Sequence, residues 1–308
     1  MPKIHIDKSI VISKPVAEVF AKINDFNHWG KWSPWLILEK DVKVTVREDS
    51  KYYEWEGDIT GSGNMTIASE VENTSLNIDL AFLKPWKSVA KVGFILKPEG
   101  DGTRLHWTMD SSLPWFMFWM KKMMISFVGM DYERGLNMLK DYAEDGKVHS
   151  ALDFKGIETY DGCQYVGIKS TCTIDGLGEQ MKTDFEQLMP FMIGEHKDKI
   201  SGSAFSIYHK WNPVKNVVSY TSAVPVSATP ENLQDRMITG SVPSTKVFKV
   251  HHKGAYRHAG NPWSALYTRQ RAKVFKTNKK IDPMEVYLNS PKDTPENDLQ
   301  TEVLFAIR

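Results

Sequence analysis

Six short runs of alternating apolar and polar residues follow one another in the first half of the chain, and no other feature constrains the fold as strongly. Gly, Asn, Pro or charged residues separate the runs, as at residues 61–63 and 99–102. Runs of this length between turn residues are typical of antiparallel strands joined by tight turns. We expect six consecutive strands, at residues 41–47, 52–57, 64–69, 76–82, 88–96 and 103–109.

One strand and one short helix are predicted before these runs, and one long helix after them. Residues 3–13 alternate as a strand does, and the sequence Ser13-Lys14-Pro15 then opens a helix, because Ser is a good cap and Pro is tolerated in a first turn. The long helix is expected over residues 114–146, with Gly146 as its stop. Its second part carries one apolar stripe, made of Tyr132, Leu136, Leu139 and Ala143.

The first part of the long helix, residues 115–127, is apolar nearly all round. A helix of that kind is buried on several sides or lies against an apolar partner. We expect this segment to belong to the core. The alternatives are a lid over a pocket, or a patch that touches a membrane surface or a protein partner.

The order of these elements and four short motifs resemble the START-like, or SRPBCC, family, which has the helix-grip fold of polyketide cyclase-type proteins. The resemblance covers residues 1–146 and implies a curved antiparallel sheet around a long C-terminal helix. It also implies an apolar cavity between them for lipids, polyketides or other hydrophobic molecules. The motifs are Ser13-Lys14-Pro15-Val16-Ala17-Glu18-Val19-Phe20, Trp32-Ser33-Pro34-Trp35, Gly102-Thr103 with Trp107, and Gly135-Leu136 with Leu139-Lys140.

Composition limits the classes of function. A length of 308 residues predicts two domains, and a formal net charge of +1 argues against direct nucleic-acid binding, which needs a basic surface. The sequence has no run of about 18 apolar residues, so no membrane span is predicted. The two cysteines, Cys163 and Cys172, are expected to be reduced thiols, since their spacing fits neither a disulfide framework nor a zinc site. We therefore expect a cytoplasmic protein with no metal and no cofactor; the sequence does not determine its oligomeric state.

A polar stretch at residues 147–154 is predicted as a linker to a second domain over residues 155–308. The element order strand, helix, strand, strand occurs twice in that domain, at residues 157–226 and 245–308. The predicted fold class is therefore α+β, with a helix-grip domain followed by a domain of two strand-helix-strand-strand repeats.

Within the second repeat, residues 281–291 are predicted to form a short strand bounded by prolines. Side chains alternate in direction along a strand, so Met284 and Val286 face the core, whereas Glu285 and Tyr287 share the other face. A solvated polar face would explain this pattern. The more specific interpretation is a binding concavity in which Glu285 meets a cation and Tyr287 stacks on it.

The second half of the chain resembles the GyrI-like, or AraC-type, effector-binding domain, which is also found in drug-sensing regulators. The resemblance implies a pocket between the two repeats, walled by aromatic residues, in which an acid pairs with cationic or aromatic ligands. That acid corresponds to Glu285 here. The matching stretches are His252-Lys253-Gly254-Ala255-Tyr256, Trp263 with Leu266-Tyr267, Pro283-Met284-Glu285-Val286-Tyr287-Leu288 and Thr301-Glu302-Val303-Leu304.

Carried over residue by residue, the resemblance assigns Tyr287 as the neighbour of the acid. It assigns Trp263 and Tyr267 as wall residues, which a spacing of four places on one helical face, although both would also suit a core. Tyr208 and Tyr220 are further candidates on strands of the partner repeat.

Three residues near these candidates raise other interpretations. Arg257 lies in a bulky basic loop that departs from the family pattern, and it could neutralise the acid in place of a ligand. His251 and His252 are adjacent on a predicted strand, so they face opposite ways and cannot chelate one metal together.

The sequence favours two classes of function. The first is a small-molecule-binding protein for hydrophobic, aromatic or cationic compounds, with Glu285 as the pocket acid. The second is a hydrolase or cyclase-like enzyme in which Glu285 is a general base and Tyr267 or Tyr208 orients the electrophile. A scaffold or inhibitor that acts through a protein partner is a third reading.

Overall fold

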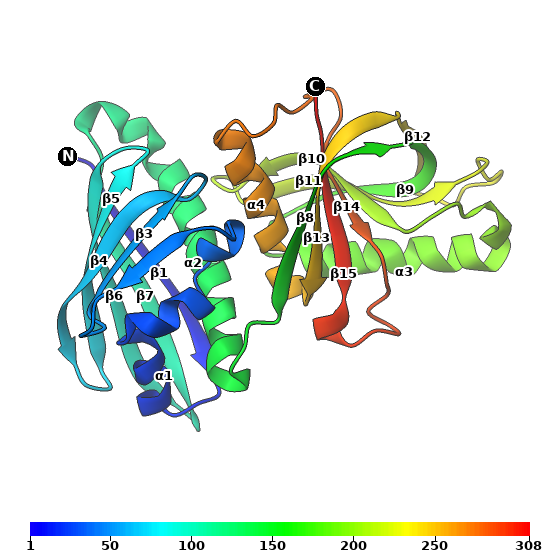
Figure 1. The fold of residues 1–308 in the computed structure, drawn as a ribbon. Helices are drawn as coiled ribbons and strands as arrows, with labels where there is room; N and C mark the ends of the chain where they lie inside the picture. Colours follow the sequence, from blue (N-terminus) through cyan, green and yellow to red (C-terminus); the bar gives the residue numbers. More distant parts are fainter. The chain divides into compact units, whose positions relative to one another are not determined.

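The chain folds into two units, Met1–Ser150 and Ala151–Arg308, and the computed structural model describes all residues from 1 to 308. Each unit is built on one antiparallel sheet with few helices, which confirms the predicted α+β class. None of the helices combines the length and the apolar character that a membrane crossing requires. Figure 1 shows the ribbon of both units.

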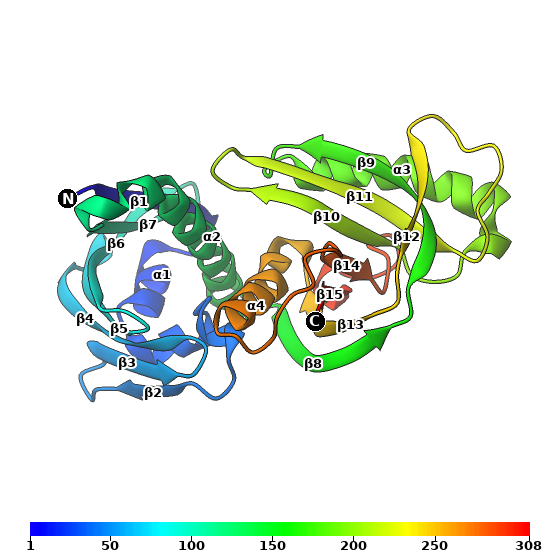
Figure 2. The same cartoon turned by 90° about the horizontal axis from the view of Figure 1, so that it is seen from above.

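The first unit is a sheet of seven strands in the order β1-β7-β6-β5-β4-β3-β2. The sheet curves around the helices α1 and α2, as Figures 1 and 2 show. The predicted strand, helix, six strands and long helix are thus confirmed. The strands are β1 (Lys3–Ile12), β2 (Lys43–Val46), β3 (Tyr52–Gly57), β4 (Gly61–Val71), β5 (Ser75–Lys84), β6 (Ser88–Glu99) and β7 (Gly102–Ser112). The helices are α1 (Val16–Ile23), the 3₁₀ helices η1 (Phe26–Lys31), η2 (Leu36–Leu38) and η3 (Trp115–Met120), and α2 (Lys121–Asp145).

Aromatic side chains fill the space between this sheet and α2. Trp107 of β7 is stacked on Tyr132 of α2, with ring centroids 4.1 Å apart, and on Phe94 of β6 at 5.1 Å. Leu136 and Leu139 continue the stripe of Tyr132 and are also buried, as the helical spacing predicts. Gly146 ends α2 in the left-handed conformation that Gly adopts at little cost.

The expectation that residues 115–127 are one buried helical stretch is wrong. Residues 115–120 form η3, in which Met117 has non-helical dihedral angles, and α2 begins only at Lys121. Only one side of η3 meets the core, through Met117 and Met120. The aromatic residues of η3 are exposed: Trp115, Phe116, Phe118 and Trp119.

The second unit is a sheet of eight strands in the order β12-β9-β11-β10-β14-β15-β13-β8. Its strands are β8 (Ser150–Tyr160), β9 (Cys163–Cys172), β10 (Phe205–Asn212), β11 (Val217–Val226), β12 (Met237–Val242), β13 (Thr245–Gly254), β14 (Met284–Tyr287) and β15 (Gln300–Ala306). Its helices are α3 (Leu177–Glu195), α4 (Gly260–Arg271) and the 3₁₀ helices η4 (Lys197–Lys199), η5 (Tyr256–His258) and η6 (Glu296–Asp298).

The two predicted repeats are confirmed as β9-α3-β10-β11 and β13-α4-β14-β15. They meet at the centre of the sheet, where β10 pairs with β14. The edge strand β12 was not expected from its mixed sequence, and its pairing with β9 is a long-range contact. The strand β8 begins at Ser150, inside the stretch 147–154 that was predicted as a linker.

Candidate functional site

Glu285 lies on β14, at the junction of the two repeats. The register of the central pair places Glu285 opposite Ser206 of β10. Met284 and Val286 pack into an apolar cluster on the other face of the sheet, so alternation turns Glu285 toward the face that carries the helices. Its side chain is buried, with 3% of its surface exposed. A carboxylate this deeply buried requires partners.

Two side chains donate hydrogen bonds to Glu285, and both end on Oε2. The Tyr208 hydroxyl donates at 3.0 Å, and the Trp263 indole Nε1–H donates at 3.3 Å. Tyr208 is two residues beyond Ser206 on β10 and therefore faces the same side of the sheet. Trp263 lies in the first turn of α4. Because both donors use one oxygen, Oε1 is left for another partner.

Burial raises the pKa of Glu285 to about 6, while the hydrogen bonds from Tyr208 and Trp263 act in the opposite direction. Burial also raises the pKa values of Tyr208 and Tyr287 well above the ordinary range, and the nearby charge of Glu285 adds to this. Both tyrosines therefore stay protonated and act as donors at neutral pH. The site is a carboxylate surrounded by neutral aromatic groups.

Tyr287 forms the side of the site nearest to α3. Its hydroxyl lies 3.0 Å from the Ser206 hydroxyl and 3.1 Å from Met181 Sδ. Its ring meets Phe185 of α3 edge to face, at 5.7 Å between centroids, and Tyr256 at 6.1 Å. Residues from both repeats thus surround the position of Glu285.

The aromatic side chains of α4 form the opposite side. The Trp263 ring meets Tyr208 edge to face with centroids 4.7 Å apart, and lies roughly parallel to Tyr267 at 6.3 Å. Tyr267 also meets Phe305 of β15 edge to face at 4.9 Å. Tyr267 is 41% exposed and forms no hydrogen bond with Glu285. It therefore lies at the rim of the site.

Tyr220 is buried beside Tyr208, but its hydroxyl turns to a second acid. It donates to Oδ2 of Asp184 at 2.8 Å, and Ser170 donates to Oδ1 at 3.0 Å. Arg236 also lies within 3.3 Å of Asp184, which is fully buried. Sequence reasoning missed Asp184, although an acid between the apolar residues of the α3 stripe was a usable signal.

The remaining candidates lie away from Glu285. Arg257 pairs with Glu296 at 2.5 Å and makes no contact with Glu285, so it does not neutralise the acid. His209, which follows Tyr208 on β10, forms a hydrogen bond with Asp282 at 2.7 Å. Burial lowers the pKa of His252 to about 3, so it is neutral.

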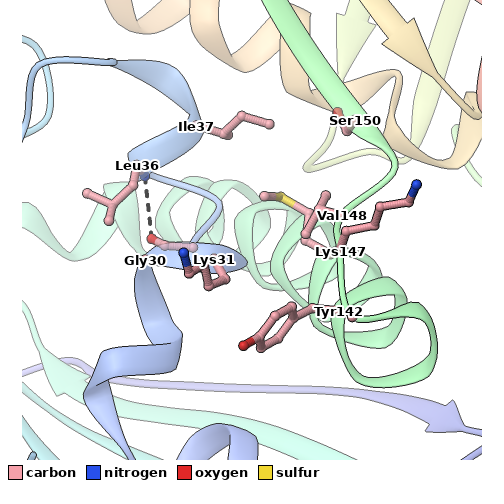
Figure 3. A pocket seen from close by; sticks show the side chains of 11 residues that line it. Gly30, Lys31, Leu36, Ile37, Tyr142, Lys147, Val148 and Ser150 are labelled. Carbon is pink, nitrogen blue, oxygen red and sulfur yellow. Dashed lines mark hydrogen bonds between the residues drawn. The ribbon is translucent and has the colours of Figure 1, made fainter.

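Two pockets of different size lie in the first unit. The cavity beneath the sheet is lined by aromatic residues such as Trp29, Trp55 and Tyr132, but its volume is only about 60 Å³. Ligand pockets usually measure roughly 300–1,000 Å³, so the rings nearly fill this space. A larger open pocket of about 360 Å³ lies at the C-terminal end of α2, between Leu36, Tyr142 and neighbouring residues (Figure 3).

Family models match both halves of the chain. Residues 3–144 match the family described as polyketide cyclase/dehydrase and lipid transport. Residues 157–308 match the GyrI-like small molecule binding domain. Both resemblances seen in the sequence are confirmed by these matches.

Several solved structures are similar to parts of the chain. An EcmrR–DNA complex is 15% identical over 61% of this chain and 68% of that chain, with a TM-score of 0.43. SAV2435 bound to tetraphenylphosphonium is 15% identical over 51% of this chain and 94% of that chain, with a TM-score of 0.39. CalU16 from Micromonospora echinospora is 21% identical over 47% of this chain and 77% of that chain, with a TM-score of 0.32. No curated protein sequence matches the chain.

Proposed function

We propose that this chain, which joins a polyketide cyclase/dehydrase and lipid transport domain to a GyrI-like small-molecule-binding domain, captures hydrophobic aromatic cations beside Glu285. The observation that carries it is a buried carboxylate whose two donors share Oε2. Oε1 is thus available for a positive charge.

The aromatic surroundings favour a large cation with apolar faces. Tyr208, Trp263 and Tyr287 lie around the carboxylate, and a desolvated cation is attracted to ring faces as well as to a carboxylate. An ionised carboxylate with an unfilled oxygen is costly in such a place, and a cation removes this cost. Small, strongly hydrated cations would gain less, because they must lose their water shell.

Calorimetric titration with tetraphenylphosphonium, set against the neutral compound triphenylphosphine oxide, tests the proposal. The wild-type protein should bind the cation and bind the neutral compound at least about tenfold more weakly. Glu285→Gln should lose this preference. Asp282→Asn is the matched control, because Asp282 lies three residues away and bonds to His209 instead. Equal binding of both compounds by wild type would refute the cation preference.

A hydrolase is the second candidate, and the pKa of about 6 for Glu285 favours it. A carboxylate with that pKa is largely ionised at pH 7 and is suited to take a proton from water. Tyr208 then orients the electrophile from its place next to Oε2. Incubation with aromatic epoxides followed by product analysis tests this role. Recovery of the compounds unchanged would exclude it for this substrate class, whereas turnover that Glu285→Gln abolishes would support it.

We also propose that the protein acts in the cytoplasm, where the free thiols of Cys163 and Cys172 stay reduced. A net charge of +1 gives the whole chain little attraction for nucleic acid, and we propose that any regulatory action passes through a protein partner. Labelling of the thiols in protein taken directly from cells, without reductant, tests this placement.

A further inference from the structure

Five large aromatic side chains are exposed at one end of the first unit, and together we name them the aromatic tip. Their exposed fractions range from 59% to 78%. Aromatic side chains present roughly 150–250 Å² each, so the tip exposes about 500–900 Å² of largely apolar surface. Soluble proteins rarely expose more than about 300–600 Å² in one patch without an interaction partner. The five residues are Trp86, Trp115, Phe116, Phe118 and Trp119.

Strand register places Trp86 at the same end as η3. Ala90 of β6 lies opposite Ser111 of β7, so the loop between β5 and β6 extends past the end of β7. The helix η3 begins three residues after that end. The core of the unit takes Met117 and Met120 from η3 and leaves its aromatic rings outside. Folding of the unit therefore does not account for these rings.

Lysines surround the tip, and acids are missing from its sequence. No Asp or Glu occurs in residues 80–98 or 111–130. Those two stretches contain six lysines, of which Lys84 and Lys91 pair with acids of other strands. Three exposed lysines next to the aromatic rings, Lys87, Lys121 and Lys122, take part in no ion pair. The tip is thus apolar at its centre and positive at its border.

We infer that the aromatic tip docks on the surface of an anionic phospholipid bilayer. Trp prefers the boundary between headgroups and acyl chains, and Lys next to it is attracted to anionic headgroups. The tip consists of a protruding loop and a short helix, and this shape suits insertion into a fluid surface. The docking does not depend on Glu285.

Flotation of the full chain with vesicles tests this inference. Vesicles of phosphatidylcholine with about 30% phosphatidylglycerol should retain the protein, and vesicles of phosphatidylcholine alone should retain far less. Replacing two rings by Trp115→Ala and Trp119→Ala should weaken binding at least about tenfold. Reversing two charges by Lys121→Glu and Lys122→Glu should weaken binding to the anionic vesicles and remove its dependence on salt.

A matched control comes from the opposite end of the same sheet. Val71 is exposed at the far end of β4, and Val71→Ala should bind vesicles as wild type does. All substituted residues are exposed, so unchanged circular dichroism and thermal unfolding should accompany the loss of binding. Wild type that stays unbound to anionic vesicles would overturn the inference. A concentration-dependent dimer that the Trp115→Ala/Trp119→Ala change abolishes, without vesicle binding, would also overturn it and assign the tip to self-association.

Discussion

Replacing Glu285 by Gln should stabilise the second unit at neutral pH and leave it unchanged in acid. The native pKa of Glu285 lies at about 6, above its ordinary value of 4.5, because burial penalises the charged form. The native state therefore holds the proton more tightly than the unfolded chain, and ionisation opposes folding as pH rises from 4.5 through 6. A difference of that size corresponds to about 2 kcal/mol. Gln removes the charge, and its carbonyl oxygen can still accept from Tyr208 and Trp263.

Hydrogen exchange of the peptide over residues 281–291 measures the change in stability within the second unit. Eight of the ten tryptophans lie in the first unit, so fluorescence would report mainly that half. The difference in opening free energy between Glu285→Gln and wild type should be near zero at pH 4 and about 2 kcal/mol in favour of the variant at pH 7.5. The other carboxyl groups are present in both proteins, so their contributions cancel in the difference in opening free energy. A difference that does not change with pH, or a variant that is less stable at pH 7.5, would refute the reasoning.

Three further predictions concern other parts of the structure. Tetraphenylphosphonium should bind about tenfold more tightly at pH 7 than at pH 5, because Glu285 ionises between them; a flat calorimetric profile would contradict this. Gly135→Ala should lower the stability of the first unit by about 1–3 kcal/mol in urea unfolding, since the added Cβ would lie 2.6 Å from the Trp107 ring; an unchanged midpoint would mean that the helix can shift. Asp184→Ala should cost about 3 kcal/mol in thermal unfolding, because Tyr220 loses its buried acceptor, and a neutral result would show that water replaces the carboxylate.

Local patterns predicted most of the elements, since alternation and helical spacing depend on neighbours in sequence. The stripe of Tyr132, Leu136 and Leu139 was recognisable for that reason. The exposure of the aromatic residues in 115–120 was not predictable, because hydrophobicity shows that a surface is apolar but not whether other elements cover it. The edge strand β12 depends on a long-range pairing, which its own residues do not signal.

In the candidate site, too, local features were predictable and long-range contacts were not. The sequence showed that Glu285 lies on an alternating strand. It also showed that the side chains of Glu285 and Met284 face opposite sides of that strand. Tyr208 and Trp263 were named as pocket candidates, but their hydrogen bonds to Glu285 were not predictable, because both side chains reach it from β10 and α4 only after the repeats meet. Tyr220 was predicted to line the same pocket, yet its hydroxyl bonds to Asp184 on α3. Whether these aromatic residues bind a ligand stays a prediction.

The closed form of the site bears on which ligands it can select. Glu285 is almost sealed, whereas Tyr256 and Tyr267 at the rim are 39% and 41% exposed. A ligand that reaches Oε1 must move a neighbouring ring aside, while Tyr208 and Trp263 keep their hydrogen bonds to Oε2. In the proposed binding mode, a cation at Oε1 compensates the charge of the carboxylate. A neutral ligand at Oε1 leaves that buried charge uncompensated, at a cost that its apolar contacts must overcome. Under the proposed function, selectivity for cations would follow from this unpaired charge as well as from the aromatic side chains around it.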